Sequence, residues 1–287
     1  MIEWSVELMN IRPMFHDDIV FALALTSAEK WNSTKRDFEE LLEYDPHGCF
    51  IGEIESEPIG MVCTVSYGVF GFIGNLIVRE PYRGQQYGKS LMEYGMNYLR
   101  IHGAKSILID AVPKALKLYE RLGFRKICKS LRLEGSISGT KSSHVRGMTQ
   151  KDLSPISDLD ASLFGGRRDK FLRMRFAAYP EYCKVHEIGG ELLGYIMGST
   201  SGNSVRIGPW AMKESDVSAE PLLLDFAQSV EADSLRIGVL ERNFKSLGLL
   251  HKYGFRERSF SWRMVYGEDT EATLSNYLYA ICCPARG

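Results

Sequence analysis

The sequence has no excess of charge of either sign and no long apolar run. Lys and Arg total 35 against 36 for Asp and Glu, so the formal net charge is −1. Binding to nucleic acid or to a membrane surface requires a basic excess, so neither partner is expected. The sequence contains no apolar stretch of about 18 residues, and its first residues lack the pattern of a secretory signal. We therefore expect a cytoplasmic protein without a membrane span.

Cysteine and histidine are also scarce, with six of each in the chain. The cysteines form no Cys-x-x-Cys pair, and the histidines do not cluster, so no metal site is expected. Most of the cysteines stand in apolar, strand-like runs, which favours buried, reduced thiols. They are Cys49, Cys63, Cys128, Cys183, Cys282 and Cys283.

The chain is long enough for two domains and contains an internal repeat. Gly123-Phe124-Arg125 returns as Gly254-Phe255-Arg256, and "PIGMV" from Pro58 returns as "LLGYI" from Leu192. A segment rich in Ser, Gly and Lys lies between the two copies, as is typical of a linker. We predict one domain over residues 1–135, a linker over 136–145 and a second domain over 146–287.

Apolar periodicity predicts the same order of elements in each copy. In the first copy the order is a strand, two helices, three strands, a glycine-containing loop, a helix, a strand, a helix and a strand. The predicted strands cover residues 6–14, 49–56, 58–67, 71–78, 106–112 and 124–133, and the predicted helices cover 18–31, 34–44, 88–103 and 113–123.

The loop before the third helix, "REPYRGQQYGKSL" from Arg79 to Leu91, has the composition of an anion site. The start of a helix offers unpaired N–H groups and a partial positive charge. Gly84 and Gly88 would let the backbone approach a phosphate closely, and Arg83 and Lys89 add positive charge. The loop alone is equally compatible with an ordinary turn before a helix.

The loop and a second motif resemble the GNAT superfamily of acyl-CoA-dependent N-acetyltransferases. The family's loop pattern, Gln/Arg-x-x-Gly-x-Gly/Ala, corresponds to Arg83 through Gly88, and its later helix pattern corresponds to Ala115, Tyr119, Gly123 and Phe124. Gln86 stands where the family has its first loop glycine, and Val112 replaces the asparagine of the helix motif. The resemblance covers most of residues 5–134 and implies an α+β fold. Each of two tandem domains would have a mixed, mostly antiparallel sheet flanked by helices.

The resemblance also implies site residues in the first copy. The pyrophosphate of acetyl-CoA would be bound by Arg83, Gly84, Gln85, Gln86, Tyr87, Gly88 and Lys89. Gln86 would be tolerated provided that its φ is negative. The backbone of Leu76, Ile77 and Val78 would bind the pantetheine arm.

The same resemblance implies two catalytic groups. The Val78 N–H would stabilise the oxyanion, and the Tyr119 hydroxyl would protonate the leaving thiolate; a core tyrosine is the alternative for Tyr119. The general base stays unassigned. Asn75 cannot accept a proton, and the spacing singles out neither Tyr67 nor Glu93.

The second copy lacks these features. Its loop, "KESDVSAEP" from Lys213 to Pro221, is three residues shorter than the corresponding segment from Arg79 to Ser90, contains no glycine and is acidic. Leu250 replaces the tyrosine. We expect that this copy does not catalyse the reaction. It would instead form one wall of the acceptor site or support assembly. Candidate acceptor contacts are Trp210, Arg167, Arg168 and Asp160, with ordinary packing or surface roles as the alternative.

These observations favour an N-acetyltransferase that transfers the acetyl group of acetyl-CoA to a primary amine in a ternary complex. The amine is expected to belong to a small molecule, and the protein to be a monomer or homodimer. The alternative function is a non-catalytic acyl-CoA-binding sensor.

Overall fold

The computed structural model describes residues 9–31, 33–215 and 217–287. By packing, the chain divides into two units. Unit 1 comprises the residues up to Leu108 together with Arg286, and unit 2 comprises Ile109–Ala285 together with Gly287. The division falls within strand β5 (Ser106–Ala111). The sequence-based boundaries at residues 135 and 146 concern the repeat and stay a prediction.

Within the described residues of unit 1, antiparallel strands lie in the order β1-β2-β3-β4, each pairing with the next. The predicted elements are confirmed, although residues 6–8 of the first predicted strand lie outside the described residues. The elements are β1 (Asn10–Pro13), η1 (His16–Asp18), α1 (Ile19–Ala28), α2 (Lys35–Tyr44), β2 (Cys49–Ile54), β3 (Glu57–Ser66), β4 (Phe70–Val78), η2 (Glu80–Tyr82) and α3 (Tyr87–Ile101).

Local chemistry explains where the helices of unit 1 begin and how closely they pack. At the start of α2, Thr34 N–H donates to Asp37 Oδ2 at 2.8 Å and Asp37 N–H donates to Thr34 Oγ1 at 3.2 Å, which is a capping box. Strand β3 is buried along most of its length and contacts α1, α2 and α3. A Cβ built on Gly95 of α3 would lie 3.1 Å from Thr64 Cγ2, so this glycine allows close packing of α3 on the sheet.

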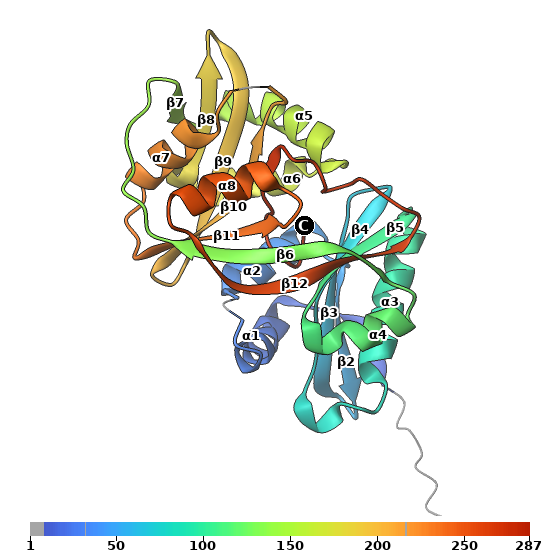
Figure 1. The fold of residues 1–287 in the computed structure, drawn as a ribbon. Helices are drawn as coiled ribbons and strands as arrows, with labels where there is room; N and C mark the ends of the chain where they lie inside the picture. The colour runs from blue at the N-terminus through green and yellow to red at the C-terminus, as the bar shows by residue number, and fades with distance from the viewer. Residues whose placement is uncertain (1–8, 32, 216) are drawn as a thin grey trace, which may run out of the picture. The chain divides into compact units, whose positions relative to one another are not determined.

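Unit 2 repeats this order with a longer sheet, β12-β6-β11-β10-β9-β8-β7 (Figure 1). Strand β13 pairs with β10. Strands β10 and β11 are parallel. The antiparallel pairs of unit 2 include β12 with β6, β6 with β11, β10 with β9, β9 with β8 and β8 with β7. The elements are η3 (Pro113–Ala115), α4 (Leu116–Arg121), β6 (Arg125–Gly135), β7 (Val145–Gly147), η4 (Gln150–Asp152), α5 (Leu153–Phe164), α6 (Asp169–Ala178), η5 (Pro180–Tyr182), β8 (Cys183–Ile188), β9 (Glu191–Ser201), β10 (Ser204–Met212), α7 (Glu220–Gln228), β11 (Ser234–Leu240), α8 (Phe244–Lys252), β12 (Arg256–Gly267) and β13 (Leu278–Ala280).

The predicted fold class is confirmed, because the chain consists of two successive α+β modules with mixed, mostly antiparallel strands. Within the segment predicted to be a linker, Thr140 N–H donates to Leu224 O at 3.1 Å and Ser142 N–H donates to Asp225 Oδ2 at 2.9 Å. This segment is therefore anchored to α7. Among the described residues, no helix is long and apolar enough to cross a membrane.

Candidate active site

Strand β4 carries a bulge shortly before its end. Its register against β3 changes from Gly74 opposite Cys63 to Ile77 opposite Met61, so β4 has one extra residue there. Asn75 lies in this bulge with a φ of +51°. A bulge leaves a residue out of the regular ladder and turns the strand, which changes where its backbone groups point.

The hydrogen-bond pattern after the bulge sets the direction of the Val78 N–H. Arg79 N–H donates to Ile59 O at 2.8 Å, and Val78 is the residue opposite Gly60. Hydrogen-bonded and non-hydrogen-bonded pairs alternate in an antiparallel ladder, so the Val78 N–H and C=O point away from β3. Consistently, Val78 O accepts a hydrogen bond from Arg83 Nε at 2.8 Å.

The loop after β4 presents a row of unpaired backbone donors. Arg83 N–H donates to Glu80 O at 3.2 Å, and Ser90 N–H donates to Gln86 O at 3.1 Å. Between them, the N–H groups of residues 84–89 have no acceptor among the described residues. The last three belong to the first turn of α3, whose dipole favours negative charge.

Space at the two loop glycines is open. No heavy atom of the described residues lies within 4 Å of a Cβ built on Gly84, whose φ is +81°. Among the part of the chain that the structure describes, a Cβ built on Gly88 would meet only Val78 Cγ2, at 3.6 Å, which is ordinary van der Waals contact. Packing within the chain therefore does not require glycine at position 88, whereas close approach of an anion to the N–H groups would.

The condition under which Gln86 would be tolerated, a negative φ, is not met. Gln86 precedes α3 with φ +69° and ψ −1°, which is left-handed backbone. Among the residue types, glycine adopts this conformation most readily, and the conformation costs other residues free energy. The loop therefore keeps a shape suited to glycine although the side chain has changed.

The charged side chains of the loop already have partners in unit 1. Arg83 Nη2 lies 2.6 Å from Glu29 Oε1, at the end of α1, in addition to its bond to Val78 O. Lys89 Nζ lies 3.8 Å from Glu93 Oε1, one turn along α3. Tyr87 is buried, and Gln85 Nε2 donates to Pro81 O at 3.2 Å. The backbone donors, rather than these side chains, are the groups that the loop leaves available.

Tyr119 lies on α4 in unit 2 and is 9% exposed. Its ring packs edge-on against Phe124, with 6.0 Å between centroids. Its hydroxyl forms no hydrogen bond with any described residue. Burial raises the pKa of Tyr119 to about 12, so the hydroxyl keeps its proton at neutral pH.

The conceivable bases in unit 1 are engaged elsewhere. Tyr67 is buried, and its hydroxyl donates to the backbone oxygen of Arg286 at 2.7 Å. Glu93 is exposed on α3, where it faces Lys89. These contacts assign a catalytic role to neither Tyr67 nor Glu93, and the general base stays unassigned.

The interpretation of four second-copy residues as acceptor contacts is not supported. Trp210 is fully buried in the unit 2 core and packs on Tyr279 with 4.9 Å between ring centroids. Arg168 Nε and Asp160 Oδ2 form a buried ion pair of 2.7 Å, and Tyr195 also donates to Asp160. Arg167 is an exposed residue paired with Asp158 and Asp169. These contacts are those of packing and surface residues.

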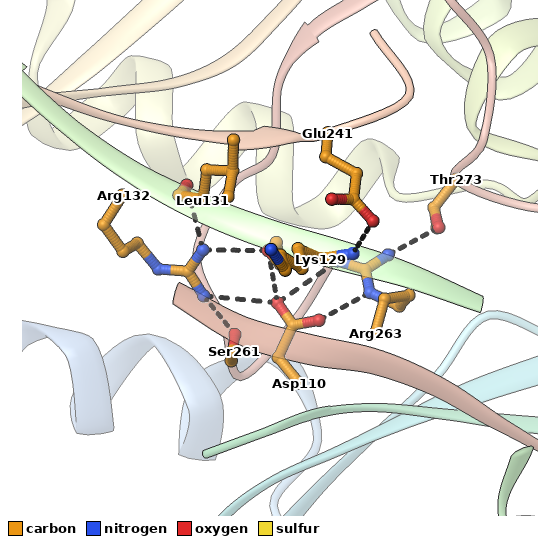
Figure 2. A network of polar contacts seen from close by, with 9 residues as sticks. Asp110, Lys129, Leu131, Arg132, Glu241, Ser261, Arg263 and Thr273 are labelled. Atoms are coloured by element: carbon orange, nitrogen blue, oxygen red, sulfur yellow. Dashed lines mark hydrogen bonds and ion pairs between the residues drawn. The ribbon is translucent and has the colours of Figure 1, made fainter. Parts of the chain in front are cut away.

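A buried polar network in unit 2 was not anticipated (Figure 2). Asp110 Oδ1 accepts from Arg263 Nε at 2.6 Å, and Asp110 Oδ2 lies 3.4 Å from Arg132 Nη2. The repeat in the sequence aligns Arg132 with Arg263, and the structure brings both to one carboxylate. Arg132 also donates to the hydroxyls of Ser130 and Ser261, at 2.8 Å and 3.0 Å. The network joins β5, β6 and β12. Along the chain, β5 is followed by η3 and then by α4, which carries Tyr119.

Two family models match the chain. The model of the acetyltransferase (GNAT) family matches residues 18–124, and that of an acetyltransferase (GNAT) domain matches residues 156–280. The two matches fall on the two copies of the repeat.

Individual relatives are distant but cover most of the chain. A holothin acyltransferase of a Pseudoalteromonas species is 23% identical over 85% of this chain and 83% of its own. The crystal structure of a putative acetyltransferase from Pyrococcus horikoshii superposes with a TM-score of 0.83 at 22% identity, covering 97% of this chain and 96% of that chain.

A tandem GNAT protein from the clavulanic acid biosynthesis pathway gives a TM-score of 0.64 at 13% identity, over 92% of this chain and 99% of that chain. At these identities the solved structures establish the shared fold. The family models extend the similarity to both copies, and the chain belongs to the GNAT superfamily as an acyl-CoA-dependent N-acyltransferase with two tandem GNAT domains.

Proposed function

We propose that the protein is an N-acetyltransferase that moves the acetyl group of acetyl-CoA to the primary amine of a small molecule. The observation that carries the proposal is the row of unpaired N–H groups at residues 84–89, beside glycine positions that leave room for a ligand. A pyrophosphate satisfies several such donors at once, and the start of α3 adds the favourable end of a helix dipole.

The bulged end of β4 supports a role in binding the thioester. The backbone of Leu76, Ile77 and Val78 follows the extra residue of the bulge, and the Val78 N–H points away from β3. A donor held by a strand is preorganised and can stabilise the oxyanion that forms when an amine attacks a thioester carbonyl. The attack forms a C–N bond, and the collapse of the tetrahedral intermediate breaks the C–S bond and releases the thiolate.

Tyr119 is the proposed donor to that thiolate. With a pKa of about 12, it is protonated throughout the neutral range. Full proton transfer to a thiolate whose conjugate acid has a pKa of about 8.5 would cost about 5 kcal/mol. A hydrogen bond from the neutral hydroxyl stabilises the departing sulfur without that cost, and water can supply the proton afterwards.

The choice of a small acceptor rests on the net charge of −1, which provides no general attraction for nucleic acid. The relative named holothin acyltransferase acts, by its name, on holothin and not on nucleic acid. The test is a panel of small primary amines incubated with acetyl-CoA and the full chain, with free thiol release and acetylated product measured together. Amine-dependent product and thiol in equal amounts are expected. Thiol release without acetylated amine, or neither with any amine, would contradict the proposal.

A further inference from the structure

The C-terminal segment of unit 2 adds a short strand to β10 just beyond its bulge. Trp210 is the partner of Ala280, and Ala211 is the partner of Leu278. One residue later, Met212 N–H donates to the carbonyl oxygen of Tyr277 at 2.9 Å.

The position of this contact in the repeat is informative. Strand β10 aligns with β4 from end to end without a gap, so Met212 corresponds to Val78. Lys213 N–H donates to Leu193 O at 2.7 Å, and Met212 lies opposite Gly194, so the Met212 N–H points away from β9. This is the direction that the Val78 N–H takes relative to β3. In unit 2 this N–H donates its hydrogen bond to a carbonyl oxygen of the same chain, that of Tyr277.

Two more elements of unit 2 hold the same segment. Ile281 N–H donates to Gly238 O of β11 at 2.9 Å. From the start of α8, Asn243 Nδ2 donates to Leu278 O at 2.8 Å, and Ser246 Oγ donates to Tyr279 O at 2.7 Å. Asn243 is the residue that aligns with Val112, so the asparagine missing from the first copy binds this segment in the second.

The segment is buried as well as hydrogen-bonded. Tyr279, Ala280 and Ile281 are 6%, 1% and 6% exposed, respectively. Tyr279 and Ala280 belong to the same core cluster as Trp210. A peptide strand and an acyl-pantetheine arm are both extended chains bearing carbonyl and amide groups, so one groove can accept either type of chain.

We infer that residues 277–281 occupy, in unit 2, the groove that the repeat makes equivalent to the acyl-pantetheine groove of unit 1. Unit 2 therefore binds its own C-terminal strand in place of acyl-CoA. Because residues 277–281 fill this groove, unit 2 can keep the groove although its loop after β10 contains no glycine.

Hydrogen exchange on the full chain, read residue by residue, tests this inference. In the parent chain the amides of Met212 and Ile281 should exchange as slowly as those in the middle of β11. Saturating acetyl-CoA should leave both rates unchanged. Exchange at these two amides as fast as in exposed loops, or a change on adding acetyl-CoA, would overturn the inference.

Variants make the test specific. Asn243→Ala and Ser246→Ala should each speed exchange at Met212 and Ile281 by about tenfold, because each removes one donor to the segment. The control Ser162→Ala removes an exposed hydroxyl whose one hydrogen-bond partner among the described residues is Leu159 O, and should leave these rates unchanged. Unchanged rates in both groove variants would show that the segment does not depend on this groove. The same data give the exchange rates of the amides of residues 84–89 in unit 1. A failure of the proposed acetyl-CoA site would appear there, separately from the rates at Met212 and Ile281.

Discussion

The substitution Gly88→Ala should strengthen the fold and weaken acetyl-CoA binding. The added Cβ would lie 3.6 Å from Val78 Cγ2, its nearest neighbour, so the chain accepts the methyl group without strain. Position 88 is the second residue of α3, and alanine favours a helix over glycine by up to about 1 kcal/mol. The same methyl group enters the space in front of the loop N–H groups. Loss of one hydrogen bond to a charged phosphate costs about 1.5–3 kcal/mol, or about 10- to 150-fold in Kd.

Gly95→Ala in the same helix is the matched control. There the added Cβ would lie 3.1 Å from Thr64 Cγ2 and 3.5 Å from Val62 Cγ2, so α3 or the sheet must shift. Overpacking of this kind costs about 1–3 kcal/mol, which exceeds the helix gain. Thermal unfolding and calorimetric titration of both variants provide the comparison. If Gly88→Ala lowers the Tm and keeps the parent Kd, glycine 88 serves the fold and the argument for a phosphate cradle fails.

Three further substitutions test individual residues. Gln86→Gly should relieve the left-handed backbone, raise stability by about 1 kcal/mol and bind acetyl-CoA at least as well; a lower Tm would contradict the strain argument. Tyr119→Phe should lower kcat by about 100-fold or more with little change in KM for acetyl-CoA, and a loss below threefold would return Tyr119 to a packing role. Because its pKa is raised to about 12 by burial, the parent should lose stability as pH rises from about 10 to 12, and the Phe variant should lose less over that range in alkaline unfolding curves. Trp210→Ala should destabilise the chain by about 3–5 kcal/mol and leave acceptor KM unchanged; a raised acceptor KM at unchanged stability would restore the role in acceptor binding.

Elements defined by local pattern could be predicted from the sequence. The strand from residues 71–78 and the helix from 88–103 appear as β4 and α3 because apolar spacing reports which face of an element is buried. Gly103, the last residue of the predicted helix, follows α3 with a φ of +91°, a left-handed conformation that is typical of a glycine at the end of a helix.

Features that depend on distant partners could not be predicted. The repeat pairs Arg132 with Arg263, but only the folded chain shows that Asp110 lies between them. Trp210 resembled a ligand contact because an indole suits a binding site as well as a core. Its full burial follows from how β10 packs, which the local sequence does not specify.

Gln86 illustrates a different limit. Glutamine rarely adopts positive φ, so the local sequence does not indicate that the condition for tolerating it, a negative φ, fails at this position. The turn between β4 and α3 imposes the left-handed conformation, and the surrounding structure compensates for its cost.

The central claim is that the loop of the first copy, and that loop alone, binds acyl-CoA. Calorimetric titration of the full chain with acetyl-CoA tests it most directly. One molecule should bind per chain, and Gly88→Val should abolish that binding while the protein stays folded, because a branched side chain fills the space before the N–H groups of residues 84–89. Two equivalent sites per chain, or unchanged binding by Gly88→Val, would contradict the claim.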